Sequence, residues 1–300
     1  MGRVRIGVAG WSYRDWDGIV HPNRAGRRFD QLSYLAGYFD VIEANVTFYR
    51  LPQARNSISW VKRTSHNPEF RFTVKLHRHF THERDALSPS DEIQWREGLE
   101  PLQEAGKLGA VLVQFPYSFH CNVTNQRYLA RLVERFPEYP LVVEVRHRSW
   151  DSPETFQFFS DIGIGFCNID QPRVSYSILP SSRVTSPLGY IRLHGQNVRD
   201  WFRKNAGRDA RYNYLYSEVE IAKWLGRIKE TARQTRELYV ITNNHYRGQA
   251  VCNALQLKAS VTNRKVPVPS LMIPVYPQLK RLRGGRPIMK IGSEEKRENG

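Results

Sequence analysis

A carboxylate and a guanidinium lie two residues apart at the end of an apolar stretch, where they could bind or transform a charged substrate. The stretch, residues 141–145, is rich in β-branched side chains and carries Glu144, and Arg146 follows it directly. Side chains two positions apart on a β-strand point to the same side, so these two charges are expected to share one face. Such a strand is either a solvated edge or the floor of a functional site, and the elements around it decide between the two.

Polar side chains end several other apolar segments in the same way. Lys75 ends an alternating segment, residues 70–76, and Arg192 and His194 alternate with apolar neighbours in residues 190–194. Other segments end in Glu43, Asn45, Gln114, Asp170, Asn243 and Asn244. Carboxylates, an imidazole and cations brought to one place could transfer protons and stabilise an anion. Whether they meet depends on how the segments are arranged.

The segments are predicted to form eight strands, separated mostly by helices. The expected strands are residues 3–9, 41–45, 70–76, 108–115, 141–145, 164–170, 190–194 and 238–242. Helical patterns cover residues 30–39, 57–65, 91–106, 125–136, 152–162, 218–233 and 248–258. This order predicts an α/β fold, a TIM-like (β/α)8 barrel with a closed parallel sheet surrounded by helices. An open doubly wound sheet is the alternative, but the first strand is not followed by GxGxxG and there is no Walker motif.

A barrel explains why the polar strand ends matter. Its strands are covered on both faces, so their polar side chains cannot be explained by bulk solvation. Barrel enzymes build their sites at the carboxyl ends of the strands, where most of these residues fall. The alternative is a plug of ion pairs, such as Glu144 with Arg192 and Asp170 with Lys75. We favour a ligand site, because buried pairs alone are costly to desolvate.

Residues 1–260 are expected to form this single barrel domain. Residues 261–300 are first proline-rich and then charged, and they are expected to form a partly flexible extension. No apolar run approaches the roughly 20 residues of a membrane-spanning helix, and no signal-peptide core is apparent. The three cysteines are scattered without CxxC spacing, which favours a reduced, cytoplasmic protein.

The formal net charge of +16 at pH 7 favours an anionic partner. Single-stranded or damaged nucleic acid and a phosphorylated metabolite both fit this charge, and a merely basic surface is the alternative. The charge does not point to an oligomeric state.

The chain resembles the family of domain of unknown function 72, also called YecE-like, over about residues 5–258. The resemblance rests on matching segments in order, which begin Gly10-Trp11-Ser12-Tyr13 and continue through Glu43-Ala44-Asn45, Phe72-Thr73-Val74-Lys75, Glu144-Val145-Arg146, Arg192-Leu193-His194-Gly195 and Asn243-Asn244. It implies a TIM-barrel-like fold and no settled activity.

Two kinds of chemistry fit the polar residues. In the first, Glu144 or Glu43 acts as base, His194 as acid, and Lys75 or Arg192 holds an anion, with Asp170 as a further catalytic candidate. In the second, Glu144, Asp170 and His194 hold a divalent metal. The metal is not favoured, because arginines would repel it and because Asn243 and Asn244 are neutral. No other cofactor is predicted.

Aromatic side chains near the expected strand ends could stack on a base or a sugar. Residues 195–216 interleave Arg199, Arg203, Lys204, Arg208 and Arg211 with Trp201, Phe202, Tyr212 and Tyr214. Such a mixture suits single-stranded or damaged nucleic acid, and buried packing is the alternative. Substrate-binding candidates are Lys75, Arg146, Arg192, Asn45, Gln114, Tyr49, Trp11, Asn243, Asn244 and His82. The predicted function is a hydrolase of phosphodiesterase type acting on a phosphate-bearing substrate; the alternatives are a non-catalytic binding protein and a sugar-phosphate isomerase-like enzyme.

Overall fold

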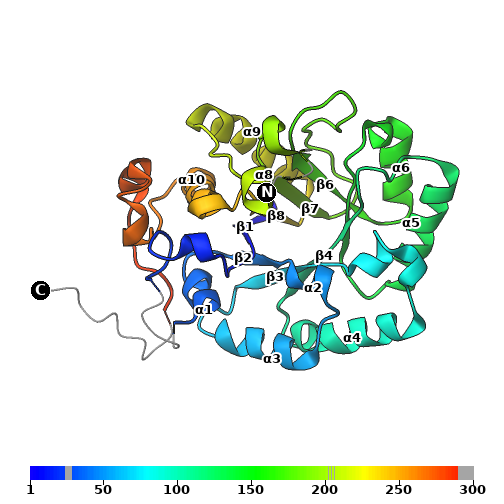
Figure 1. Ribbon diagram of the computed structural model, residues 1–300, viewed down its shortest axis with the longest axis horizontal. Helices are drawn as coiled ribbons and strands as arrows, with labels where there is room; N and C mark the ends of the chain where they lie inside the picture. The colour runs from blue at the N-terminus through cyan, green and yellow to red at the C-terminus, as the bar shows by residue number, and fades with distance from the viewer. Residues whose placement is uncertain (24–28, 202, 204, 206, 290–300) are drawn as a thin grey trace, which may run out of the picture.

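Eight parallel strands close into a barrel in their sequence order, β1 to β8, and helices surround it (Figure 1). The computed structural model describes residues 1–23, 29–201, 203, 205 and 207–289. The strands are Arg3–Ala9, Val41–Ala44, Arg71–Lys75, Leu108–Gln114, Leu141–Glu144, Gly165–Asp170, Leu188–Leu193 and Glu237–Thr242. The predicted closed barrel is confirmed, with each expected strand present: β1 has the expected bounds, and the ends of the other strands differ from the expected ones by at most two residues.

The α-helices fill the intervals between strands and cover the sheet. They are α1 Gln31–Ala36, α2 Val46–Tyr49, α3 Ala54–Arg63, α4 Pro89–Glu104, α5 Val123–Arg135, α6 Pro153–Asp161, α7 Val198–Trp201, α8 Arg208–Arg211, α9 Glu218–Gln234 and α10 Gln249–Thr262. In the part of the chain that the structure describes, none of the helices has the length and apolarity needed to cross a membrane.

Local sequence signals explain where the helices begin. The Asp30 side chain accepts a hydrogen bond from the Ser33 amide at 3.0 Å, which caps α1 as predicted. Ser152 caps α6 ahead of a proline in the first turn. Ser217 and Glu220 form a reciprocal capping box at the start of α9. These caps fix the residue at which each loop ends and its helix begins. They thereby help to set the shape of the barrel mouth, which is the end of the barrel where the strands have their carboxyl ends.

Residues 261–289 pack against the barrel. Val266, Met272 and Leu279 are buried, and α10 itself continues to Thr262, past the expected domain end at residue 260. The charged end of the expected extension, residues 290–300, lies outside the described residues.

The register of the strands determines which side chains face the barrel interior. The Tyr190 hydroxyl lies 2.9 Å from Glu43 Oε2 and 2.8 Å from Thr73 Oγ1, so these side chains meet inside the barrel. Ile169 is the partner of Arg192 in the neighbouring strand and therefore shares its inward face. Asp170, the next residue, points outward.

Candidate functional site at the barrel mouth

Arg192 joins two buried carboxylates across the barrel. Its Nη2 donates to Glu43 Oε1 at 2.7 Å and its Nη1 donates to Glu144 Oε2. Glu43 and Glu144 are both 0% exposed. Arg146 Nε and Nη2 donate to Glu144 Oε1 at 3.0 and 2.9 Å, so the pair two residues apart does share one face. The four side chains form a compact charged network, with its charges in balance.

The network fixes the charge state of Glu144. Burial by itself would raise its pKa, but Arg192, His194 and Arg146 together hold the pKa of Glu144 well below its usual value. The carboxylate is therefore an anion near neutral pH that accepts protons poorly. Its geometry supports a role in positioning the two arginines rather than the role of a base.

His194 completes the network in a neutral form. Burial, outweighing the attraction of Glu144, lowers its pKa to about 3. Its Nδ1 lies 2.9 Å from Asn243 Nδ2, which can only donate, so the ring proton belongs on Nε2, 3.3 Å from Glu144 Oε1. The rings of Trp201 and Tyr212 lie over it, with centroids 6.0 and 6.4 Å away. His194 is fully buried, so the geometry does not favour a direct role as an acid.

Lys75 has a different environment from the arginines. It ends β3, is partly exposed, and its Nζ lies 3.6 Å from the centre of the Phe48 ring. Among the described residues, no carboxylate lies within ion-pair distance of this amine. Burial lowers the pKa of Lys75 to about 7, with a further contribution from Arg192. A substantial fraction of the amine is therefore neutral at neutral pH.

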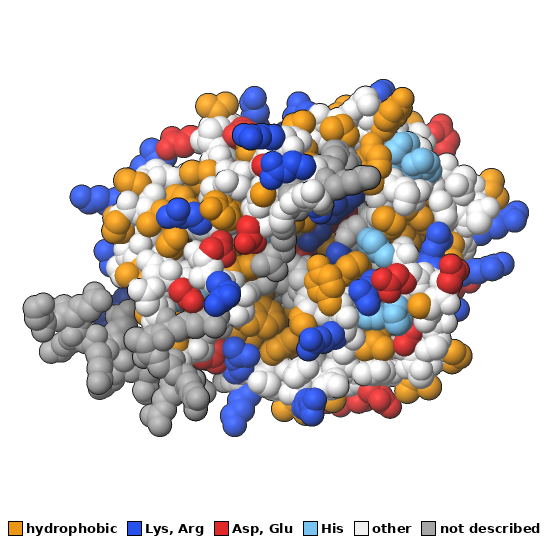
Figure 2. Space-filling model, viewed as in Figure 1, with side chains coloured by type: hydrophobic (Ala, Val, Ile, Leu, Met, Phe, Trp, Pro, Cys, Tyr) orange, Lys and Arg blue, Asp and Glu red, His pale blue; other side chains and the backbone are white. Residues whose placement is uncertain are grey.

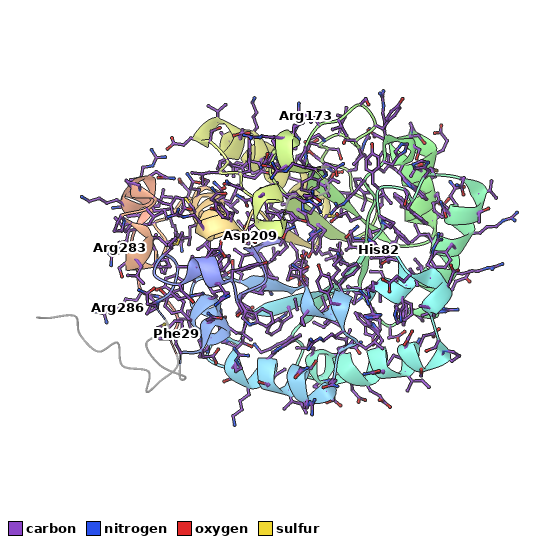
Figure 3. The ribbon with its side chains drawn as sticks, in the orientation of Figure 1. Phe29, His82, Arg173, Asp209, Arg283 and Arg286 are labelled. Carbon is purple, nitrogen blue, oxygen red and sulfur yellow. The ribbon has the colours of Figure 1, made fainter. Side chains whose placement is uncertain are left out.

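Arg146 and His82 lie where the charged network in the barrel interior meets the surface. The Arg146 side chain is 17% exposed and its guanidinium lies 5.6 Å from the centre of the Trp201 ring. Part of His82 is exposed at the surface, while its ring packs edge-on against Phe48. The partial desolvation of the ring, together with the charges of Lys75 and Arg146, lowers the pKa of His82 to about 4. Figure 2 shows Lys and Arg side chains within a hollow near the middle of this face. Figure 3 places His82 and Asp209 on opposite sides of the barrel centre.

The structure does not bring Asp170 to the same place. Because Ile169 faces inward, the Asp170 side chain lies outside the barrel, where its Oδ2 accepts from the Tyr216 hydroxyl at 2.5 Å and its Oδ1 from Gln196. The proposed metal set of Glu144, Asp170 and His194 is therefore not assembled. Among the described residues, no group of three His, Cys, Asp or Glu side chains is placed to hold a metal ion. The expected Asp170–Lys75 pair is likewise not formed.

Some of the remaining predicted substrate-binding residues lie at the barrel mouth, and others pack against neighbouring elements of the fold. Asn244 also faces outward, donating to Asn253 Oδ1 at 2.8 Å and to the Tyr214 carbonyl at 2.7 Å. Trp11 packs edge-on against Trp60 at 5.4 Å. Gln114 is buried and donates to the carbonyl of the next residue, Asn45 is partly buried after β2, and Tyr49 is 61% exposed at the end of α2.

The described residues of the segment 195–216 bring two aromatic rings over the network. Trp201 and Tyr212 contact each other edge-on at 5.6 Å, and Tyr214 donates to Glu220 at 2.5 Å. Arg203 pairs with Asp200 at 3.2 Å. Phe202, Lys204 and the Arg208 side chain lie outside the described residues. Much of the aromatic content is thus occupied in packing, which weakens the case for a stacking platform there.

Two residues of the site, Tyr190 and Phe48, were missed from the sequence. Tyr190 precedes Arg192 and His194 with the same alternation, so its inward position was open to prediction. Phe48 gave no such signal, because it reaches Lys75 from α2, a four-residue helix that was not expected.

Comparison with known proteins gives a consistent family. Residues 5–275 match a family model described as "Protein of unknown function DUF72". The UPF0759 protein YunF of Bacillus subtilis (strain 168) is 30% identical over 269 residues, covering 85% of this chain and 93% of that protein. A solved DUF72 family protein from Thermotoga maritima MSB8 is 36% identical with a TM-score of 0.76, covering 87% of this chain and 99% of that one. One from Enterococcus faecalis V583 is 27% identical with a TM-score of 0.76, covering 86% and 95%.

Proposed function

Because the chain belongs to the DUF72 family, whose description names no reaction, we propose a function from its site alone: the protein is a hydrolase of phosphate esters. In this proposal the substrate binds at the barrel mouth, Arg146 holds its phosphate, and the neutral amine of Lys75 takes a proton from the attacking water as the water oxygen bonds to phosphorus. The ester P–O bond breaks, and the alcohol leaves with a proton from solvent. Single-stranded or damaged nucleic acid and a small phosphorylated metabolite are both substrates of this chemistry.

The observation that carries the proposal is the unpaired amine of Lys75. A general base works best when its pKa lies near the operating pH, and burial beside other cations is how a lysine reaches that range. A lowered pKa alone would not suffice. The pKa of Lys107 falls to about 8 by burial, but its Nζ donates to the carbonyls of Asn67 at 3.0 Å and Thr64 at 3.3 Å. Lys75 makes no such bonds to described residues, so its lone pair is available for chemistry.

Arg146 is suited to hold the phosphate. Two of its nitrogens bind Glu144, whereas Nη1 makes no hydrogen bond to a described residue. A guanidinium that is fixed by one carboxylate and still has free N–H groups can bind a phosphate oxygen with little loss of side-chain entropy. Glu144, Arg192 and Glu43 would then hold Arg146 in position, and their charges would help to set the pKa of Lys75.

A non-catalytic anion-binding protein is the second candidate. It is favoured by the pairing of both buried carboxylates with arginines, which leaves Glu43 and Glu144 engaged in ion pairs rather than directed at a substrate. The two candidates agree on where the anion binds and differ only in whether Lys75 transfers a proton.

Phosphatase and phosphodiesterase assays over a range of pH test the proposal. The substrates are p-nitrophenyl phosphate, bis-p-nitrophenyl phosphate and an oligonucleotide with an abasic site, each with and without added Mg²⁺ or Mn²⁺. We expect kcat/KM to rise with pH through about 7, because the base must be neutral, and Lys75→Met to lower it by about 10² to 10⁴-fold. Lys62→Met, an exposed lysine of α3, is the matched control.

Gel-shift titrations against salt complete the test. Arg146→Met is expected to weaken binding and to reduce its salt dependence, since one phosphate contact is lost. Binding without turnover at every pH and metal would reject the hydrolase and leave the binding protein. Turnover that Lys75→Met leaves unchanged would reject Lys75 as the base.

A further inference from the structure

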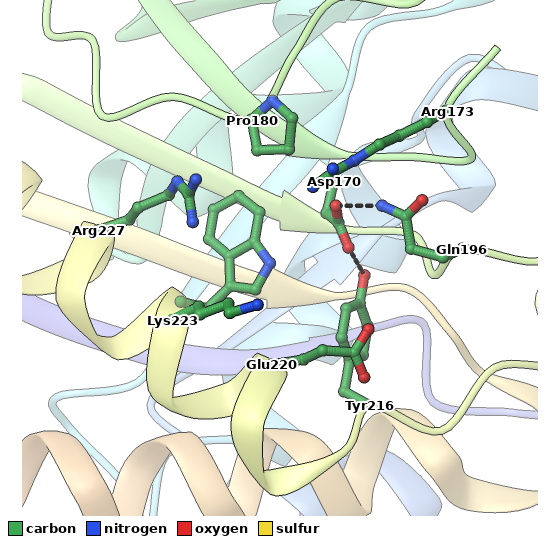
Figure 4. Close-up of a pocket in the computed structure, with 9 residues that line it drawn as sticks. Asp170, Arg173, Pro180, Gln196, Tyr216, Glu220, Lys223 and Arg227 are labelled. Carbon is green, nitrogen blue, oxygen red and sulfur yellow. Dashed lines mark hydrogen bonds between the residues drawn. The ribbon is translucent and has the colours of Figure 1, made fainter.

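A single carboxylate outside the barrel joins the two ends of the segment that covers the mouth. Gln196, near its start, donates to Asp170 Oδ1, and Tyr216, at its end, donates to Oδ2 at 2.5 Å (Figure 4). The Tyr216 hydroxyl also accepts the Gly195 amide at 2.8 Å. Residues 195–216 are therefore held at both ends by one buried group, 3% exposed, on β6.

A cavity of about 290 Å³ opens beside this carboxylate. Its acidic wall consists of Asp170 and Glu220, whose oxygens already accept hydrogen bonds from Tyr216, Tyr214 and Ser217. Trp224 and Pro180 give it an apolar wall. The volume approaches the lower limit of sites for small metabolites, roughly 300 Å³.

Three cations, Arg173, Lys223 and Arg227, line the same cavity. They come from the loop after β6 and from one face of α9, where Lys223 and Arg227 are four residues apart. Among the described residues, none of the three has a carboxylate within ion-pair distance. Figure 4 shows Lys223 and Arg227 on one side of Asp170 and Arg173 on the other.

We infer that this cavity binds a sugar phosphate or a similar phosphorylated polyol. Unpaired guanidinium and ammonium groups suit a phosphate, which accepts several charge-assisted hydrogen bonds. An ionised carboxylate has about four acceptor positions, and the hydrogen bonds above leave some of them open on Asp170 and Glu220, so the hydroxyls of a polyol can donate to both. The apolar wall matches the C–H face of a sugar. Neither a bare phosphate nor a neutral sugar uses both halves of the cavity.

The ligand also acts on the mouth. Gln196 and Tyr216 line the cavity and anchor residues 195–216, which carry the Trp201 and Tyr212 rings over His194. A polyol bound to Asp170 adds contacts to both anchors and so stabilises the covering position of the segment. The cavity is thus an effector site for the barrel mouth, distinct from the place where the substrate phosphate binds.

Isothermal titration calorimetry with glucose 6-phosphate, ribose 5-phosphate and glycerol 3-phosphate tests this site. We expect at least one of them to bind, and the double variant K223A/R227A to weaken that binding by about tenfold or more, because two charge-assisted contacts are lost. Lys229→Ala removes an exposed charge elsewhere on α9 and should bind as the wild type does. Arg146→Met, which removes the phosphate contact proposed at the mouth, should also retain binding, and this result separates the cavity from the mouth.

Hydrogen–deuterium exchange with the same ligand tests the coupling. Amides of residues 195–201 and 207–216 should exchange more slowly when it is bound, and K223A/R227A should abolish that effect. Absence of binding by all three ligands, or equal binding by the double variant, would overturn the site. Inorganic phosphate binding as tightly as the best of them would overturn the polyol, and unchanged exchange would overturn the coupling.

Discussion

Replacing Glu144 by glutamine removes one negative charge from the centre of the barrel and keeps the shape of the side chain. Glu144 is 0% exposed and binds Arg192, Arg146 and His194. Breaking a buried ion pair from one side costs about 3–5 kcal/mol, because the remaining charge is left without compensation. Arg192 would keep Glu43, and Arg146, partly exposed, could gain water, so the loss should fall at the lower end, about 3 kcal/mol.

Thermal unfolding measures that loss. With an unfolding entropy of about 2.1 cal/mol/K per residue, 3 kcal/mol corresponds to a Tm lowered by about 5 °C in a chain of this length. Glu218→Gln is the control, because Glu218 and Arg281 form a pair in which both side chains are 59% exposed. Such a pair contributes at most about 1 kcal/mol, and its loss should lower Tm by less than about 2 °C.

A double variant separates uncompensated charge from lost packing. Arg146→Met combined with Glu144→Gln removes one charge of each sign, and it should recover part of the stability that Glu144→Gln alone loses. The reasoning would be refuted if Glu144→Gln lowered Tm no more than Glu218→Gln, since the network would then not be desolvated. Glu144 also raises the pKa of Lys75, so Glu144→Gln should move the pH midpoint of any activity below that of the wild type.

Three further predictions concern the pH dependence and the covering segment. The pKa of His194 falls from 6.5 to about 3, so between these pH values the unfolded chain binds a proton that the folded protein does not. The free energy of unfolding should therefore decrease as the pH falls from 6.5 toward 3. His194→Asn should flatten this decrease, as measured by urea unfolding. The pKa of Lys75 falls from 10.5 to about 7, so stability should rise with pH between these values. Lys75→Met should reduce this rise and leave the part that comes from Lys107, whose pKa falls to about 8. Trp201→Ala should expose His194 and speed its modification by diethyl pyrocarbonate, followed by mass spectrometry; an unchanged rate would mean that Trp201 does not cover the ring.

Much of the barrel was predictable because each strand carries its own signal. Apolar, β-branched segments at regular intervals predict the strands, and residues such as Asp30 and Ser152 mark the helix starts. The spacing alone predicted that Glu144 and Arg146 share a face, since residues two positions apart on a strand point to the same side; the hydrogen bonds between them were not predicted. The helix α2 escaped prediction because four residues carry too little periodicity, and with it the contact of Phe48 with Lys75 was missed.

The position of Asp170 shows where prediction from one strand ends. Within β6, the sequence establishes that Asn168 and Asp170 share a face and that Ile169 has the other, but not which face is inward. The neighbouring strand β7 decides this. Arg192 of β7 reaches Glu43 and Glu144 across the barrel, so its partner in β6, Ile169, must face inward. Asp170 therefore faces outward, toward Tyr216 and Gln196. The same register that keeps Asp170 out of the central network makes it the anchor of residues 195–216. The role of a polar residue at the end of a strand thus depends on the register between strands. Glu144 and Asp170 are both carboxylates that end apolar strands, but Glu144 faces the barrel interior and Asp170 faces outward.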